Sequence, residues 1–254
     1  MTPEQLERYA RHIVLPEIGG PGQRRLLASS VLLVGAGGIG APAALYLAAA
    51  GIGRIGLVDH DVVSRSNLQR QVLYAEADIG RPKVEAAAMR LAARNPDCRI
   101  EPHHDRLDAA NAAELVAGYD LVLDGSDNFA TRLAVAEACV RRRRTLVSAA
   151  IRRFEGQLAV FKPHAGADLP CYHCFVGADP GHLDETPCAE LGILGAAAGV
   201  LGSWAAAEAV KELVGGLPTL AGRLLIVDLL DARARTIALP PDPACPHHRW
   251  LAAG

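Results

Sequence analysis

The sequence lacks the features of membrane, disulfide-rich and nucleic-acid-binding proteins. Only 4% of its 254 residues are aromatic, and its formal net charge is −2. A nearly neutral chain has no overall attraction for nucleic acid or a membrane surface. No charge-free apolar run reaches the roughly 20 residues that span a bilayer, and the polar stretch from Met1 to Arg11 is unlike a secretory leader. We therefore expect a soluble, cytoplasmic protein.

Cysteine is also scarce, with six residues in the chain. In a cytosolic protein of this length, cysteines indicate metal binding or thiol chemistry more than a disulfide framework. Cys98 and Cys139 fall within strand and helix patterns and are expected to be inert core residues. The other cysteines stand in or near irregular segments.

Two chelating pairs stand in the C-terminal half, Cys171-Tyr172-His173-Cys174 and Cys245-Pro246-His247-His248. Each pair can hold two corners of a tetrahedral Zn²⁺ ion. A closed site with four protein ligands is structural and would pin the tail to the preceding loop. A redox CxxC pair and an empty site are the alternatives. The predicted ligands are Cys171, Cys174, Cys245 and His248, with His247 competing for the fourth place.

Alternating strands and helices predict an α/β fold for residues 31–150. The apolar run 31–34 enters the glycine-rich turn 35–40, an alanine-rich helix follows to about residue 50, and 55–59 is a second strand. Further expected helices are 82–94, one that is capped by Asp108 and reaches 116, and a segment ending at 140, and further strands are 98–102, 121–123 and 145–149. This pattern predicts a Rossmann-like, doubly wound sheet that is parallel over this half.

The flanking segments differ from this pattern. Helices are expected over 3–13 and 23–28, separated by a turn at 19–22. Beyond 154 we expect a strand over 156–161, an irregular stretch over 163–187, a helix over 195–214, and antiparallel strands over 224–227 and 233–238. The prediction is a single domain, 1–254, with a helical arm (1–30), a nucleotide-binding half (31–150) and a C-terminal half (151–254) that carries the zinc-type pairs.

The glycine-rich turn has the context of a phosphate-binding site. Gly35, Gly37, Gly38 and Gly40 lie between a strand and a helix, where backbone N–H groups approach phosphates at the helix N-terminus. Asp59 ends the second strand about 20 residues on and is placed to bind a ribose hydroxyl. Glycines needed only for close packing are the alternative. This pair of features fits an NAD-dependent oxidoreductase equally well.

Residues beyond the second strand favour ATP over a dinucleotide. Asn67, Arg70 and Lys83 supply an amide and two cations, which a triphosphate requires as charge builds on the leaving pyrophosphate. Asp127, at the carboxyl end of a later strand, is placed to hold Mg²⁺ against the same oxygens. A helix cap is the alternative role for Asp127.

Several motifs together resemble the ThiF/MoeB/HesA family across essentially the whole chain. They are 8–13 (RYARHI), GAGGIG at 35–40, 66–71, Arg81-Pro82-Lys83 and 124–128. The resemblance implies that ATP adenylates the C-terminal Gly-Gly end of a ubiquitin-like sulfur carrier of the MoaD/ThiS type. It also implies that Asp59 binds the ribose, that Asn67, Arg70 and Lys83 bind the phosphates, and that Asp127 binds magnesium.

The resemblance extends to three further features. Arg11 resembles an arginine that the family supplies from a partner subunit, which implies a homodimer; a plain surface arginine is the alternative. Cys188 resembles a cysteine that can link covalently to the carrier, against a small residue packed under the loop. His248 stands where the family has a fourth cysteine ligand.

Residues 155–157 and 188–190 look more like the MoeB branch, and thus molybdopterin rather than thiamine biosynthesis. The chain ends six residues after His248, so we expect a separate sulfur donor. The rival functions are a relative that adenylates a tRNA-bound threonylcarbamoyl group, an NAD-dependent oxidoreductase, and a silent binding scaffold. The zinc-type pairs and neutral charge disfavour the first, and the phosphate-handling residues disfavour the other two.

Overall fold

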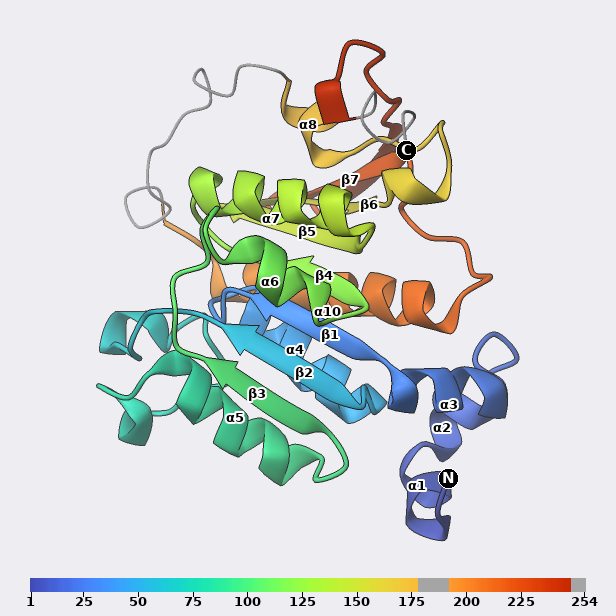
Figure 1. Cartoon of the computed structure of the whole chain (residues 1–254). Coiled ribbons are helices and arrows are strands. Elements are labelled where there is room, and N and C mark those ends of the chain that lie inside the picture. Colours follow the sequence, from blue (N-terminus) through green and yellow to red (C-terminus); the bar gives the residue numbers. More distant parts are fainter. Residues whose placement is uncertain (178–191, 248–254) are drawn as a thin grey trace.

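The computed structural model describes residues 1–177 and 192–247 (Figure 1). Its centre is an eight-stranded sheet with the order β3-β2-β1-β4-β5-β6-β7-β8. The strands are β1 (Ser30–Val34), β2 (Arg54–Val58), β3 (Arg99–His103), β4 (Leu121–Asp124), β5 (Thr145–Arg152), β6 (Glu155–Phe161), β7 (Arg223–Asp228) and β8 (Arg233–Ala238). The first five are parallel and the last three antiparallel. The predicted fold class is confirmed.

Helices cover both faces of this sheet (Figure 1). On one face, α4 (Gly40–Ala50) packs against α5 (Lys83–Arg94) and α10 (Gly195–Val214). On the other, α6 (Ala112–Ala117) packs against α7 (Phe129–Arg142), which contacts the short α8 (Tyr172–Val176). Alternate residues of β1 enter opposite core clusters, with Leu33 on the α4 side and Leu32 on the α7 side. The fully buried parallel strands are therefore apolar on both faces.

In the N-terminal arm, two helices differ from the prediction. It contains α1 (Pro3–Arg8), α2 (Ala10–Ile13) and α3 (Gly19–Ala28). The expected helix over 3–13 is broken at Tyr9, which is 2% exposed and whose hydroxyl accepts a hydrogen bond from Asn95 Nδ2 at 2.8 Å. Helix α3 begins at Gly19, so 19–22 is helix and not a separate turn. Pro21 is tolerated there because first-turn N–H groups lack intrahelical partners.

A third correction concerns the helix expected to follow the cap residue Asp108 and to reach residue 116. Asp108 Oδ1 accepts a hydrogen bond from the Ala110 N–H at 2.8 Å, as a cap residue does, but residues 109–111 form a turn. Helix α6 begins only at Ala112. The helix over 195–214 and the strand over 233–238 have the predicted ends, and the other predicted elements are present with shifted ends. The stretch over 163–187, which was expected to be irregular, contains helix α8.

Short helical turns complete the described chain: η1 (Arg65–Asn67), η2 (Glu76–Asp78) and η3 (Pro163–Ala165). The sheet ends at β3 on one side and β8 on the other, and all six residues of β8 are exposed. Among the described helices, none combines the length and the apolar character that a bilayer crossing requires.

Candidate nucleotide and metal sites

A pocket opens at the carboxyl ends of the parallel strands, where the sheet order reverses between β1 and β4. Ligands of doubly wound sheets bind at this kind of crevice. The pocket brings together seven of the predicted residues, Gly35, Gly37, Gly38, Asp59, Arg70, Lys83 and Asp127. Gly40, Asn67 and Arg11 are not among its lining residues.

The glycine turn between β1 and α4 requires glycine for steric reasons. Gly35 has a φ of +82°, and a Cβ there would lie 3.2 Å from the Gly125 carbonyl oxygen. A Cβ at Gly40 would lie only 1.9 Å from the carbonyl oxygen of Gly35. The buried Tyr74 hydroxyl donates a hydrogen bond to the Ala36 carbonyl at 2.8 Å. The turn is therefore closely packed, and Gly40 leaves room for that packing beneath the pocket.

Asp59 leaves the end of β2 toward this turn. Its Oδ2 accepts a hydrogen bond from the Ala36 N–H at 2.8 Å, and its Oδ1 accepts one from the Asp61 N–H at 2.8 Å. These bonds orient the carboxylate, which lines the pocket. The position is suited to a ribose hydroxyl.

Lys83 is the most buried cation of the pocket, with 4% exposure. Its Nζ lies 2.7 Å from Asp61 Oδ2. Burial acts to raise the pKa of Asp61, but the hydrogen bond and charge of Lys83 outweigh it and hold that pKa below its usual value. Sequence reasoning missed Asp61. The sequence could have indicated such a residue, because Lys83 is the first residue of α5 and a buried amine requires an acidic partner.

Arg70 and Asn67 follow β2 but differ in placement. The Arg70 side chain extends over Gly38, where a Cβ would lie 3.6 Å from Arg70 Cγ, and its guanidinium donates to the Ser66 carbonyl at 3.0 Å. Asn67 Oδ1 accepts from the Ser64 N–H at 3.3 Å and caps η1. Arg70 therefore faces the pocket, while the Asn67 side chain is engaged in shaping the loop.

Asp127 lies in the turn after β4 and is exposed to the pocket. The cap of α7 is made by its neighbour, Asn128, whose Oδ1 accepts from the Thr131 N–H at 2.8 Å. The capping alternative for Asp127 is thus filled by another residue. A carboxylate beside the glycine turn is suited to a divalent cation bound to phosphate oxygens.

Three polar residues around this turn were missed by sequence reasoning. Among the described residues, Gln71 Oε1 and Ser126 Oγ are buried atoms of the pocket lining without hydrogen-bond partners. Arg132 donates hydrogen bonds to the carbonyls of Ser126 and Ala149. Asn128 caps α7, and Arg132 is the fourth residue of that helix. The cap and this spacing in the sequence could have indicated that Arg132 lies close to the turn.

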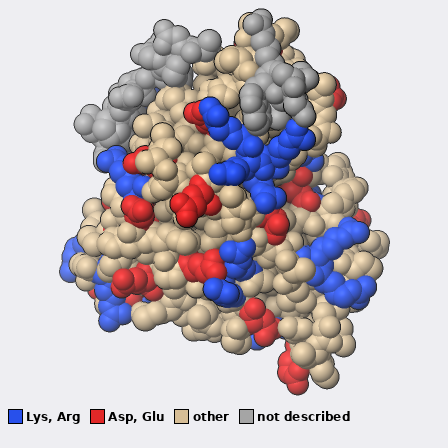
Figure 2. All heavy atoms as spheres, viewed as in Figure 1, with Lys and Arg blue, Asp and Glu red and all other residues tan. Residues whose placement is uncertain are grey.

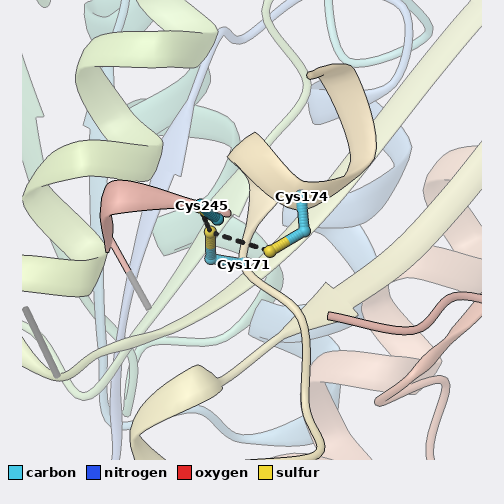
Figure 3. Close-up of side chains that lie close together, drawn as sticks. All are labelled: Cys171, Cys174 and Cys245. Atoms are coloured by element: carbon cyan, nitrogen blue, oxygen red, sulfur yellow. Dashed lines mark hydrogen bonds between the residues drawn. The ribbon is translucent and has the colours of Figure 1, made fainter. Parts of the chain in front are cut away.

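The second site is a cluster of three cysteines (Figure 3). Cys171 Sγ lies 3.6 Å from both Cys174 Sγ and Cys245 Sγ. Ligands about 2.3 Å from a tetrahedral Zn²⁺ lie about 3.8 Å apart, so the spacing fits zinc. Hydrogen bonding from Cys171 lowers the pKa of Cys174, which favours the thiolate that a metal requires. Three of the four predicted ligands, Cys171, Cys174 and Cys245, therefore lie together as expected.

Of the two candidates for the fourth ligand, His247 lies among the described residues. The ring of His247 stacks on His173 with centroids 3.7 Å apart, and the described group of adjacent metal-ligating atoms contains only the three cysteines. His248 and Cys188 lie outside the described residues. Cys98 and Cys139 are buried, and burial raises the pKa of both thiols; their prediction as core residues is confirmed.

A glycine turn at the switch point of a doubly wound sheet, with acidic and cationic groups around it, defines a Rossmann-like nucleotide-binding protein. A family model described as the ThiF family matches residues 9–247, and the chain belongs to this family. The resemblance predicted from the sequence motifs is thus confirmed.

The chain is 47% identical over 247 residues to a sulfur carrier protein adenylyltransferase of Thermus thermophilus, covering 96% of this chain and 91% of that protein. It is 45% identical to a probable adenylyltransferase/sulfurtransferase MoeZ of Mycobacterium tuberculosis, covering 97% of this chain and 63% of that protein. This likeness bears out the MoeB-like branch. The E. coli MccB structure has a TM-score of 0.82 at 22% identity, covering 98% of this chain and 75% of that chain, and supports the fold.

Proposed function

We propose that this chain is an ATP-dependent adenylyltransferase that activates the C-terminal glycine of a ubiquitin-like sulfur carrier protein. The observation that carries the proposal is the pocket, which combines the glycine turn and Asp59 with Arg70, Lys83 and Asp127. The Thermus relative is named a sulfur carrier protein adenylyltransferase at 47% identity over nearly the whole chain. An NAD-dependent oxidoreductase leaves both cations and Asp127 without a role.

The reaction needs charge neutralisation more than a general base. A carboxylate oxygen of the carrier's terminal glycine is already ionised, and it attacks the α-phosphorus of ATP. The new C(O)O–P bond forms as the bond from that phosphorus to the bridging oxygen breaks, which gives an acyl-adenylate and pyrophosphate. Arg70 and Lys83 are placed to neutralise the charge that develops on the pyrophosphate. A sulfur nucleophile then displaces AMP.

Mg²⁺ and Zn²⁺ have separate proposed sites. Asp127 would hold Mg²⁺, which shields the phosphate charges when bound. Zn²⁺ would be held by Cys171, Cys174 and Cys245 with His248 as the fourth ligand, because His247 is stacked against His173. Four protein ligands leave no open position, so this metal would be structural.

A homodimer is the proposed active unit, with Arg11 reaching the partner's phosphates. Arg11 is exposed on α2 and outside the pocket of its own chain. The packed helices α4 and α10 expose Tyr46 and Trp204, at 59% and 37%. Exposed apolar side chains of this size on neighbouring helices support an interface with a second copy.

The dimer is tested by subunit complementation. Arg11→Ala should abolish adenylation but leave ATP binding and dimerisation largely intact, since the arm is held by Tyr9. Mixing Arg11→Ala with Lys83→Ala subunits should restore part of the activity, because each mixed dimer keeps one complete site. Mixed dimers without activity would refute the contribution in trans.

The reaction is tested by ATP–pyrophosphate exchange with Mg²⁺ and candidate carriers that have intact or truncated Gly-Gly ends. Carrier-dependent exchange would support the proposal and identify the pathway, for which molybdopterin is favoured over thiamine. No exchange in folded, zinc-loaded protein would favour the tRNA-modifying relative or a silent scaffold. Sulfur transfer from a separate donor to the adenylate, with Cys188→Ala alongside, would test the role of Cys188.

Location and domain organisation remain predictions. None of the five described cysteines forms a disulfide, which supports a reducing cytoplasm. The division into an arm (1–30), a nucleotide-binding half (31–150) and a half for the carrier and zinc (151–254) is supported by the position of the pocket in the parallel half and of the cysteine cluster beyond it.

A further inference from the structure

Arg11 stands between two side chains that are fastened to the body of the protein. It is the second residue of the four-residue helix α2, with Tyr9 two positions before it and His12 directly after it. Arg11 is exposed, whereas Tyr9 is 2% exposed. Of the motif at 8–13, the proposed function uses only Arg11, while Tyr9 and His12 make the contacts that attach the arm.

Tyr9 is fixed by a hydrogen bond and by close packing. Its hydroxyl accepts from Asn95 Nδ2 at 2.8 Å, and the same nitrogen donates to the Ala48 carbonyl at 2.7 Å. The Tyr9 ring covers Gly51, which has a φ of +85° and at which a Cβ would lie 2.6 Å from two ring carbons. The ring fits there because Gly51 has no side chain. Tyr9 therefore ties the arm to the last turn of α4.

His12 makes a second attachment to the same helix end. Its Nδ1 lies 3.0 Å from Gln23 Oε1, and Gln23 Nε2 donates to the Ala50 carbonyl at 2.9 Å. Gln23 is completely buried. A carbonyl only accepts, so Gln23 presents its nitrogen to Ala50 and its oxygen to His12, and the His12 Nδ1 carries the hydrogen of that bond. Tyr9 and His12 thus hold α2 at two points against the carboxyl end of α4.

These attachments place Arg11 far from the pocket of its own chain. Helix α4 begins at the glycine turn of the pocket, and its 11 residues span about 16 Å. The arm is fastened at the opposite end of α4, away from the arrowheads of the parallel strands (Figure 1), and Figure 2 shows it projecting from the body of the molecule. Val14 and Leu15, which follow α2, are 71% and 45% exposed. Exposed apolar side chains beside Arg11 favour contact with a second copy of the chain.

We propose that two pairs of side chains are positioning residues that hold Arg11 in place for the pocket of the partner subunit. The pairs are Tyr9 with Asn95 and His12 with Gln23. A four-residue helix is not stable on its own, so the two attachments supply the order that Arg11 needs. That order matters because misplacing a group by about 1 Å can cost a hundredfold in rate. The inference rests on the proposed function, because it requires Arg11 to act on ATP bound by the partner.

Tyr9→Phe tests the first attachment with little change in packing. It removes the bond to Asn95 but keeps the ring, so kcat for carrier-dependent ATP–pyrophosphate exchange should fall about tenfold. The Kd for Mg·ATP should be unchanged, because Tyr9 is not among the described residues that line the pocket. Tyr119→Phe is the matched control: it removes another buried tyrosine hydroxyl, which donates to Glu101 at 2.7 Å, and should leave kcat unchanged. The double variant Tyr9→Phe/His12→Ala releases both attachments and should lose about a hundredfold in kcat.

Mixed dimers show in which subunit the defect acts. Double-variant subunits mixed with Lys83→Ala subunits should regain activity, because the Lys83→Ala subunit supplies a correctly held Arg11 to the intact pocket of the double variant. Double-variant subunits mixed with Arg11→Ala subunits should stay inactive, because neither subunit then has a working arm. A defect that only loosened the fold of the variant's own pocket would give the reverse pattern.

The outcomes separate this inference from the proposed function. If Arg11→Ala and Lys83→Ala complement each other but the double variant fails to regain activity with Lys83→Ala, or regains it with Arg11→Ala, the inference alone is overturned. A wild-type kcat in Tyr9→Phe would overturn the role of the first attachment. Failure of Arg11→Ala to complement Lys83→Ala would overturn the contribution in trans together with this inference, and no exchange in the wild-type protein would overturn the proposed reaction as well.

Discussion

Replacing Asp61 by asparagine should tighten ATP binding while it weakens the nucleotide-free fold. In the structure, Asp61 Oδ2 lies 2.7 Å from Lys83 Nζ, and the Lys83 side chain is only 6% exposed. A phosphate that reaches Lys83 competes with this carboxylate, and it meets the negative charge of Asp61 as well. Asp61→Asn removes that charge but keeps an oxygen that accepts a hydrogen bond.

The size of the effect follows from the exposure of the pair. A hydrogen bond to a charged group contributes about 1.5–3 kcal/mol to stability when it is well shielded. The Asp61 side chain is 54% exposed, so the pair lies toward the surface limit and about 1 kcal/mol is expected. The free energy of unfolding should fall by about that amount. The Kd for Mg·ATP should fall roughly fivefold, since the same interaction is no longer broken on binding.

Calorimetric titration with Mg·ATP and urea unfolding without nucleotide measure the two quantities. Asp105→Asn is the matched control, because Asp105 also lines the pocket but accepts from Asn111 Nδ2 at 3.3 Å instead of a lysine. It should change affinity less than Asp61→Asn. Weaker ATP binding in Asp61→Asn would refute the reasoning and make Asp61 a ligand of the nucleotide or its cation. Equal effects of the two variants would show a general charge effect.

Three further predictions follow from the packing and the charges. Lys83 holds the folded-state pKa of Asp61 below its usual 3.8. The pair's contribution to stability should therefore be complete above pH 3.8 and be lost as the pH falls through the lowered pKa. Urea unfolding from pH 7 to acid should show that the difference in stability between wild type and Asp61→Asn shrinks only at the acidic end. Gly40→Ala places a Cβ 1.9 Å from a backbone oxygen and should lower the free energy of unfolding by more than about 3 kcal/mol. Gly199→Ala has nothing within 4 Å of its Cβ and should stabilise helix α10 by about 0.5–1 kcal/mol. Similar melting temperatures for the two variants would contradict this. Cys245→Ser should lose bound zinc by elemental analysis and melt at a lower temperature, while Cys98→Ala should retain zinc; a full zinc content in Cys245→Ser would exclude that sulfur as a ligand.

The parallel half of the fold was predictable because its signals are local. The strand, glycine turn and helix of 31–50 follow from an apolar run, a steric requirement for glycine and a helix-forming segment. The break at Tyr9 was not predictable, because it depends on a hydrogen bond with Asn95 that is distant in sequence. The prediction of where α3 begins was wrong because glycine and proline usually indicate a turn, and here tertiary packing overrides that preference.

In the site, too, features with local signals were predictable and features that depend on tertiary contacts were not. The pocket residues that follow strand ends were found, because the carboxyl ends of parallel strands meet at one edge of a sheet. The pairing of Lys83 with Asp61, and the support of the Asp127 turn by Arg132, arise only when helices α5 and α7 are placed against the strands. The three-cysteine cluster was found from spacing alone, whereas the choice between two adjacent histidines depends on ring orientation.

The two outermost strands of the sheet limit how copies of this protein can assemble. Strand β3 carries Arg99 and Glu101 in an ion pair and contains Pro102, which has no N–H to donate. Strand β8 carries Arg233 and Arg235 with every residue exposed. Charges and proline at sheet borders oppose the addition of another strand. Continuous sheets that run from one molecule into the next, and the fibres that grow from them, are therefore disfavoured at both borders, which leaves the helical faces for self-association.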